Sequence, residues 1–404
     1  MNEERLNFPI AVVAYNRPGS LRRLLASLGA AEYSGSDDIP LIISIDYSGA
    51  DDCYNVANDF EWRHGPKKVI QHERRLGLIN HIYTCGDLAM DYGGVIVLED
   101  DLFVSPAFYE YVCQSYQFYQ GEPKVAGIAL YSYAFNEFSN TAFMPLQDGH
   151  DNYFAQVPCS CGQFWTDKQW DRFRQFLLSE SCGIRENDCL PDRVINRWAK
   201  NASWKAYFYK FLVYNNLYVV YPRMSLTTNF NDMGAHAVSF NTTFQVSLLF
   251  RGKNEYRFCR IDDSLAVYDY AMEPKQGILK HFNPEIRPFD FECDLNGIKR
   301  LEKVRTPYLL SIRETRNPVL SYDNCCTPAE ANVINNIKGC FYHLANVESF
   351  DSEVLRDKRI ARAFSEIKFS RSFIIEKVKG SITYRVGHFL LWPLLQLKKY
   401  LMRV

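Results

Sequence analysis

Short apolar runs alternate with helical stripes over roughly the first third of the chain, and this pattern constrains its fold most strongly. The apolar runs have strand length and little internal alternation, which indicates strands buried on both faces; they are 9–15, 41–45, 67–72, 94–98 and 125–131. The segments between them have helical spacing or length; they are 20–28, 51–62, 76–92 and 106–119. This order predicts an α/β fold with a mostly parallel sheet that helices cover on both faces.

Polar residues directly follow three of these runs. They are Asn16 with Arg17 after the first run, Asp46 after the second, and Glu99-Asp100-Asp101 after the fourth. Parallel strands bring their carboxyl ends to one edge of a sheet, where open α/β sheets bind ligands. We therefore expect these side chains to form one site.

Several classes of protein are excluded. At 47% hydrophobic and 23% charged residues, the composition is that of a globular chain. No Gly-x-Gly-x-x-Gly follows the first strand and no P-loop motif occurs, which argues against a nicotinamide, flavin or P-loop nucleotide site. No apolar run reaches transmembrane length, and the first residues lack a signal-like stretch. The 12 cysteines include no Cys-x-x-Cys pair, so we expect reduced thiols and a cytoplasmic protein.

The acidic triplet at 99–101 indicates a metal site. Three consecutive carboxylates at the end of a buried strand are unfavourable unless a positive charge compensates them. Mg²⁺ and Mn²⁺ accept such oxygen ligands and commonly bridge carboxylates to phosphates. Arg17 would contact the same phosphate. The alternative is a solvated acidic turn that caps the helix starting near Ser105.

The segment GVIVLEDDLFVSPAFYEYV at 94–112 resembles the metal-binding strand of GT-A-fold glycosyltransferases. Its Glu-Asp-Asp motif is similar to that of the animal N-acetylglucosaminyltransferase I family, and the chain also resembles bacterial family-2-like polysaccharide glycosyltransferases. The similarity covers about 8–240 and includes AVVAYNRP, SIDYS, RRLGLINHIY, CGQFWTDKQW and YPRMSLTTNFNDMGAH.

The resemblance implies a Rossmann-like GT-A fold and a metal-dependent, inverting glycosyltransferase. The donor would be a nucleotide diphosphate sugar, with UDP favoured. The acceptor would be a glycan or a lipid-linked glycan in bacterial surface polysaccharide assembly. The implied cofactor is Mn²⁺ or Mg²⁺.

The resemblance also implies roles for individual residues. Arg17 would contact the diphosphate, Asp46 the base, Glu99 the donor sugar and Asp100 the ribose, while Asp101 would bind the metal. Gly162 resembles part of a loop at the donor-sugar and acceptor end of the site. His236, in a Gly-x-His segment, would be a further metal ligand; the alternative is a histidine in a surface loop.

The general base departs from the pattern of the animal family. There, an acidic pair follows a Trp at the spacing that Trp204 and Pro222 have here, but Lys205 and Ala206 occupy the acidic positions. The nearest upstream carboxylates, and our candidates for the base, are Asp188 and Asp192. The alternative for both is a polar loop followed by a helix cap.

Three regions are predicted: a GT-A domain at 1–240, an irregular accessory region at 241–353 packed on it, and a basic helical tail at 354–404. The tail has 12 basic and 3 acidic residues, whereas the rest of the chain has 34 and 44. With the apolar stretch Phe389–Leu395, the tail predicts contact with an anionic membrane surface, at the inner face of the plasma membrane. The alternative is packing on the body. Without a recognised module, we expect no nucleic-acid partner.

Two rival functions stay open. One is a catalytically silent relative that binds nucleotide sugar or glycan, which the missing acid after Trp204 supports. The other is a sugar nucleotidyltransferase, but the glycine-rich, arginine-containing loop of such enzymes is replaced here by AYNRP.

Overall fold

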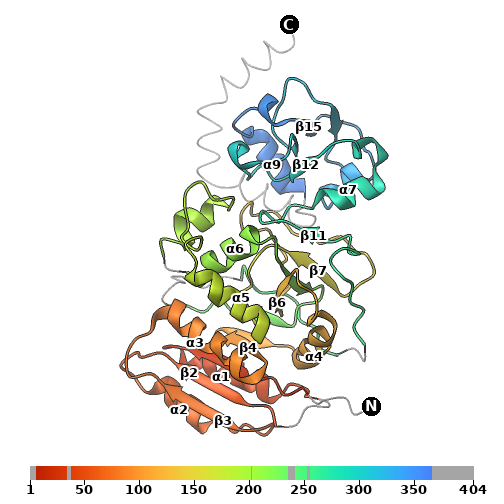
Figure 1. Cartoon of the computed structure of the whole chain (residues 1–404). Helices are drawn as coiled ribbons and strands as arrows, with labels where there is room; N and C mark the ends of the chain where they lie inside the picture. Colours follow the sequence, from red (N-terminus) through yellow and green to blue (C-terminus); the bar gives the residue numbers. More distant parts are fainter. Residues whose placement is uncertain (1–5, 34–37, 202, 235–241, 253–254, 366–404) are drawn as a thin grey trace, which may run out of the picture.

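The computed structural model describes residues 6–33, 38–201, 203–234, 242–252 and 255–365. A nine-stranded sheet with strand order β11-β7-β9-β6-β8-β4-β1-β2-β3 runs through the N-terminal and middle parts of the chain. A separate C-terminal part lies beyond the β7 and β11 end of this sheet (Figure 1).

One half of the sheet is parallel, as the alternation predicts. Its strands are β1 (Ile10–Ala14), β2 (Leu41–Ile45), β3 (Lys67–Gln71) and β4 (Gly94–Glu99). Strand β1 lies between β2 and β4 and pairs with both in parallel. Strands β1 and β2 are buried along their whole length, which explains their continuous apolar sequences.

The other half of the sheet is mixed. Its strands are β6 (Val125–Ala129), β7 (Asn152–Ala155), β8 (Gln163–Thr166), β9 (Tyr218–Pro222) and β11 (Val267–Tyr268). Strand β8 lies antiparallel between β4 and β6, whereas β6 and β9 are parallel. A two-stranded ribbon joins β5 (Leu102–Val104) to β10 (Thr227–Asn229). The predicted α/β fold with a mostly parallel sheet is confirmed.

Helices pack against this sheet through an aromatic core. They are α1 (Pro18–Gly29), α2 (Asp52–Asp59), α3 (Gly77–Tyr92), α4 (Phe108–Tyr119), α5 (Asp167–Leu178) and α6 (Trp204–Tyr214). Trp165, Trp170 and Trp204 are almost fully buried where β8, α5 and α6 meet. A capping box starts α5, because Thr166 and Gln169 each accept a hydrogen bond from the other's backbone N–H.

The C-terminal part forms its own sheet, in the order β12 (Phe291–Asp294), β13 (Tyr308–Ser311), β15 (Tyr342–Asn346) and β14 (Leu320–Tyr322). Its helices are α7 (Gln276–Phe282), α8 (Glu330–Ile334) and α9 (Arg356–Ser365), with short 3₁₀ turns at Pro284–Ile286, Leu301–Lys303 and Val347–Ser349. This part has a separate apolar core, centred on residues such as Leu310, Tyr342 and Leu344.

The region 241–353 is therefore more regular than the irregular structure we expected. Its prolines lie outside the strands, and Pro307 directly precedes β13. Strands of three to five residues give little periodicity, which is why the sequence pattern misses them. The described residues 242–252 and 255–266 contain no helix or strand, as expected.

Two sequence predictions concern the chain as a whole. The 12 cysteines are all free, in agreement with the expected thiols. Within the described ranges, no helix has the length and apolarity needed to cross a membrane. The apolar stretch Phe389–Leu395 lies outside those ranges.

Close packing between α3 and α5 allows a direct test of this fold. A Cβ added to Gly86 on α3 would lie 2.2 Å from the fully buried ring of Trp170. We expect Gly86→Ala to lower the free energy of unfolding by about 1–3 kcal/mol through overpacking, although alanine favours helices. Gly19→Ala on α1 is the matched control, because nothing lies within 4 Å of its added Cβ. Urea unfolding with equal or greater stability for Gly86→Ala would contradict this packing.

Candidate active site

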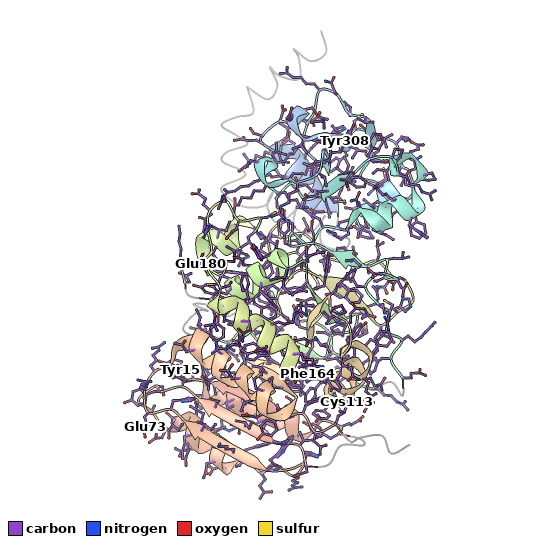
Figure 2. The ribbon with its side chains drawn as sticks, viewed as in Figure 1. Tyr15, Glu73, Cys113, Phe164, Glu180 and Tyr308 are labelled. Atoms are coloured by element: carbon purple, nitrogen blue, oxygen red, sulfur yellow. The ribbon has the colours of Figure 1, made fainter. Side chains whose placement is uncertain are left out.

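The carboxyl ends of β1, β2 and β4 meet at one edge of the sheet and line a cavity of about 400 Å³. Backbone hydrogen bonds fix the register there, since Asp46 N donates to Ala14 O at 2.9 Å and Asp100 N donates to Val13 O at 3.0 Å. The predicted residues Arg17, Asp46, Glu99, Asp100 and Asp101 all line this cavity. Tyr15, which follows β1, also lines it and lies on the side of the N-terminal part that faces the middle part (Figure 2).

Arg17 compensates two of the buried carboxylates. Its guanidinium contacts Asp100 through one nitrogen and donates to Asp101 Oδ2 at 3.0 Å through another. Burial alone would lower the pKa of Arg17, but the carboxylates of Asp100 and Asp101 raise it above its usual value. Burial raises the pKa of Asp100 to about 6 despite the opposing effect of Arg17. One cation therefore leaves this acidic edge undercompensated.

Glu99 adds a third carboxylate to this edge. Burial, followed by the nearby Asp101 carboxylate, raises its pKa to about 8. Its side chain accepts no hydrogen bond from the part of the chain that the structure describes. Three carboxylates lie around one arginine, and carboxylate oxygens are the ligands that divalent cations such as Mg²⁺ and Mn²⁺ prefer. Asp101 and its neighbours are the residues that would hold it.

Asp46 holds the start of α3. Its carboxylate accepts hydrogen bonds from the backbone N–H groups of Leu76 at 2.7 Å and Gly77 at 3.0 Å, and from that of Tyr47 at 2.9 Å. A carboxylate at a helix N-terminus satisfies donors that lack partners within the helix. Arg75 lies in the preceding turn, over the ring of Tyr15 at 4.7 Å, and also lines the cavity.

The segment after β10 covers the start of α1. Asn229 donates to Asp101 Oδ1 at 3.1 Å, and β10 pairs with β5, which directly follows the acidic triplet. Asp232 accepts a hydrogen bond from Ser20 Oγ at 2.7 Å and pairs with Arg23. These contacts could not be read from the pattern of the chain, although TTNFND is part of the segment that carries the resemblance. The predicted ligand His236 lies outside the described residues.

Gly162 directly precedes β8 and lies in a loop beside the cavity. It has φ +97°, and an added Cβ would lie 2.9 Å from the Thr227 side chain, so glycine is the residue that fits. Its neighbours Ser160 and Cys161 line the cavity. Gly162 thus acts by placing this loop.

Residues 193–205 contribute a basic and aromatic part of the lining. Arg193, Arg197 and Trp198 come from the single π-helical turn Val194–Trp198 and its N-terminal neighbour, and Lys205 comes from α6. Lys205 Nζ lies 3.4 Å from the buried carboxylate of Glu137 and 4.5 Å from the centre of the Trp198 ring. From the sequence, Lys205 stands out only as a departure from the acidic pattern of the animal family.

The structure does not bring the two candidate bases to the cavity. Asp188 forms an ion pair with Lys210 at 2.8 Å. Asp192 forms one with Arg300 at 2.6 Å, its side chain is 54% exposed, and it lines a different cavity. Neither residue is among those that line the cavity at the strand ends.

Another group of metal-ligand types lies at Asp148, His150 and Cys259, whose ligand atoms are within 4.8 Å of one another. Arg223 already contacts Asp148 at 2.6 Å, and Ser264 and the backbone of Leu265 donate to the other carboxylate oxygen. These contacts satisfy the carboxylate, so this group stabilises the loop.

Comparison with known proteins supports the GT-A interpretation. Residues 10–166, which hold β1 to β8 and the acidic edge, match the family model of glycosyl transferase family 2. The predicted GT-A fold is thereby confirmed, and residues 10–166 are similar to a glycosyltransferase domain of family 2, whereas the specific relation to N-acetylglucosaminyltransferase I stays a prediction. No curated protein matches the sequence significantly.

Three solved structures are similar at low identity. A mannosyltransferase PcManGT from Pyrobaculum calidifontis, in complex with GDP-Man and Mn²⁺, is 11% identical over 43% of this chain and 46% of that one, with a TM-score of 0.29. TarS of S. aureus is 11% identical over 55% and 36%, with a TM-score of 0.33. Mouse xyloside xylosyltransferase 1, in its apo form, is 12% identical over 43% and 72%, with a TM-score of 0.31. The chain thus spans less than half of the first two proteins, and similarities this low carry no argument.

The buried His81 next to this edge gives a pH-dependence that can be measured. His81 Nε2 lies 2.8 Å from Ser44 Oγ, and burial lowers the pKa of His81 to about 4. The unfolded chain takes up the proton at about pH 6.5, so this contribution to stability is full above that pH and is lost as the pH falls towards 4. We expect wild type to lose about 3 kcal/mol more than His81→Asn between pH 7 and pH 4 in urea unfolding.

The exposed His281 on α7 provides the control for this measurement. His281→Asn should keep the wild-type pH dependence. Parallel curves for wild type and His81→Asn would show that His81 is not held neutral by burial.

Proposed function

We propose that the chain transfers a sugar from a nucleotide diphosphate donor, a UDP-sugar in the first instance, to a hydroxyl group of a glycan acceptor. The observation that carries this proposal is the meeting of Arg17, Asp46 and the triplet 99–101 in one cavity of about 400 Å³. This volume lies within the usual range of small-molecule sites. The glycosyl transferase family 2 match over residues 10–166 includes every one of these residues.

Two groups of side chains in the cavity would bind different parts of the donor. Arg17 at the start of α1 offers guanidinium nitrogens to the diphosphate, and Arg75 and Tyr15 lie beside Asp46, where the base would bind. Asp100 would contact the ribose and Glu99 the donor sugar. A Mn²⁺ or Mg²⁺ ion held by Asp101 would supply Lewis-acid stabilisation of the diphosphate charge.

The reaction follows from these positions. The acceptor oxygen forms a bond to the anomeric carbon while the bond from that carbon to the diphosphate oxygen breaks. The diphosphate leaves with the bonding electron pair, and Arg17 stabilises the negative charge that develops on it. The acceptor proton passes to a base, which in an inverting enzyme is a carboxylate beside the acceptor hydroxyl.

One observation favours a second candidate function. Among the described residues at 193–205, those that line the cavity are Arg193, Arg197, Trp198, Asn201, Ser203, Trp204 and Lys205, and none of these is a carboxylate. A chain that binds nucleotide sugar without turnover needs no base at this position. Donor binding without release of free nucleotide diphosphate would select this second function.

The tail at 354–404 supports a place for the reaction at a membrane surface. Its described portion includes the exposed residues Arg356, Arg359 and Ile360 of α9. Basic residues are attracted to anionic lipid, which would bring the chain to a lipid-linked acceptor of surface polysaccharide assembly at the inner face of the plasma membrane.

The donor site is tested by replacing the proposed metal ligand. We expect Asp101→Asn to lower the release of UDP from UDP-sugars with MnCl₂ by about 100-fold or more, because the charge on the leaving diphosphate loses its stabilisation. The matched control is Asp262→Asn, at a carboxylate with a 77% exposed side chain that pairs with Lys124. If Asp101→Asn released UDP at the wild-type rate, Asp101 would not be a metal ligand. If the wild type released no nucleotide from any donor, the proposed glycosyltransferase activity would be refuted.

The membrane contact is tested by truncation. We expect vesicles that contain phosphatidylglycerol to sediment the full chain but much less of a chain ending at Ser365, because most of the basic tail is then absent. Raising the salt concentration should weaken sedimentation of the full chain. Equal sedimentation of the two chains would exclude a role of residues 366–404 in lipid binding.

A further inference from the structure

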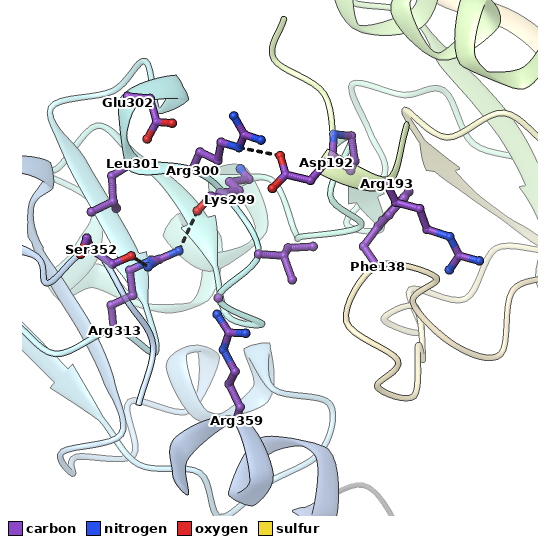
Figure 3. Close-up of a pocket in the computed structure, with 13 residues that line it drawn as sticks. Phe138, Asp192, Arg193, Lys299, Arg300, Leu301, Glu302, Arg313, Ser352 and Arg359 are labelled. Atoms are coloured by element: carbon purple, nitrogen blue, oxygen red, sulfur yellow. Dashed lines mark hydrogen bonds and ion pairs between the residues drawn. The ribbon is translucent and has the colours of Figure 1, made fainter. Parts of the chain in front are cut away.

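A second cavity, of about 380 Å³, lies between the middle and C-terminal parts of the chain. Phe138, Pro191, Asp192 and Arg193 line one side. The loop at 297–302 lines the other side together with Arg313, Ser352 and Arg359, and Figure 3 shows Arg300, Arg313 and Arg359 across the cavity from Arg193. None of these residues belongs to the donor site described above except Arg193.

Two of the cations around this cavity are neutralised within the fold. Lys299 is fully buried and pairs with Asp269 at 2.5 Å and Glu292 at 2.9 Å. Arg313 pairs with Asp294 at 3.4 Å and donates to the backbone oxygens of Lys299 and Ser352. These two side chains hold the C-terminal sheet to its loops.

The other three cations are not neutralised in this way. Arg359, on the exposed side of α9, has no side-chain hydrogen bond or ion pair within the described ranges. Arg193 donates to the uncharged backbone oxygen of Glu137 at 2.8 Å, and its Nε is buried without a partner among the described residues. Arg300 pairs with Asp192 at 2.6 Å, although more than half of the Asp192 side chain is exposed, and Glu302 also lines the cavity. Arg193 and Arg359 are therefore the two lining cations that have no ionic partner among the described residues.

The second cavity adjoins the active-site cavity. Arg193 lines both of them. Phe138 lines the second cavity and Trp198 lines the active site, and the centres of their rings are 6.1 Å apart. Arg197 continues the positive charge from Arg193 into the active site, whereas Lys205 is paired with the buried carboxylate of Glu137.

We propose that the acceptor is an anionic glycan that spans both cavities, with one acidic group near Arg197 and a later one near Arg193 and Arg359. The shared chemistry is a chain of sugars or alditols that carries carboxylates or phosphodiesters at intervals. Arginine binds both groups through paired N–H donors, and the rings of Phe138 and Trp198 offer flat apolar faces to sugar rings. This inference rests on the proposed function, because it takes residues 193–205 as the acceptor side.

This arrangement separates the two substrates by charge. The nucleotide diphosphate is held at the acidic edge through Arg17 and the bound cation, whereas the acceptor meets a surface rich in arginine. An acceptor without charge would gain nothing from the positive charges of Arg193 and Arg359. A multiply charged acceptor gains at both cavities.

The proposal is tested by calorimetry on the full chain with UDP and MnCl₂ present. The probes are oligogalacturonate, a poly(glycerol phosphate) oligomer and neutral dextran of similar length. We expect at least one anionic oligomer to bind and dextran not to bind. Arg359→Glu should weaken that binding by about tenfold or more, because it reverses a charge in the second cavity. Binding of oligogalacturonate alone would identify carboxylates, and binding of poly(glycerol phosphate) alone would identify phosphodiesters.

The control variant is Arg316→Glu, at an exposed arginine of the same C-terminal part that lines neither cavity. Equal effects of the two variants, equal binding of dextran, or failure of both anionic oligomers would overturn the proposal. So would galacturonate monomer binding as tightly as the oligomer, since one acidic group cannot reach both cavities. The donor site is tested separately by titrating the wild-type chain with UDP and MnCl₂, without an oligomer. If UDP does not bind but an anionic oligomer still binds in a way that depends on Arg359, the proposed function is refuted and the anionic glycan surface remains.

Discussion

The structure of the site depends on compensating the buried carboxylates at the end of β4 with an arginine that follows the adjacent strand β1. The parallel pairing of β1 with β4 places Arg17 beside Asp100 and Asp101, so the ion pair forms across the sheet edge. Arg17 also contacts the backbone of Asp232 and so connects this edge to the segment after β10. Because one arginine faces three carboxylates, a divalent cation would complete the charge balance, and under the proposed function the same cation would bind the diphosphate. The charges that hold this edge together would then also bind the donor.

The part of the cavity proposed to hold the acceptor, around Trp198 and Lys205, carries different charges from the acidic edge. Lys205 occupies a position that is acidic in the animal family, and its ammonium group is held between the buried carboxylate of Glu137 and the ring of Trp198. Removing one partner of a buried ion pair strongly destabilises a fold, because the other charge is left buried without compensation. A substitution at either Lys205 or Glu137 would therefore destabilise the structure around the other. The charge of Lys205 is thus compensated within the fold, and the positive charge of this part of the cavity comes from Arg193 and Arg197.

The sequence allowed the prediction of the donor side more fully than that of the acceptor side, for a physical reason. Arg17, Asp46 and Asp101 each lie within three residues of the end of an apolar run, and the geometry of parallel strands brings such positions together without further information. Asn229, Lys205 and Arg193 reach the cavity only through long-range contacts, such as the pairing of β10 with β5 and the packing of α6 on the aromatic core. The C-terminal sheet was missed because its strands have only three to five residues, too few to show an apolar period, and Asp294 at the end of β12 pairs with Arg313, which lies beyond β13. Asp188 and Asp192 were chosen by sequence distance, and their ion pairs with Lys210 and Arg300 place them elsewhere.

The near-neutral formal charge of −1 results from charges that are separated in space. Part of this separation lies between the body and the basic tail, but part lies within the body itself. Carboxylates gather at the ends of β2 and β4, and unneutralised arginines gather around residues 193–205 and the second cavity. A glycosyltransferase must hold two substrates close together and must bring each to its own side of the reacting carbon. With an anionic donor bound through a cation and an anionic acceptor bound through arginines, the same separation of charge would orient both substrates and hold their like charges apart.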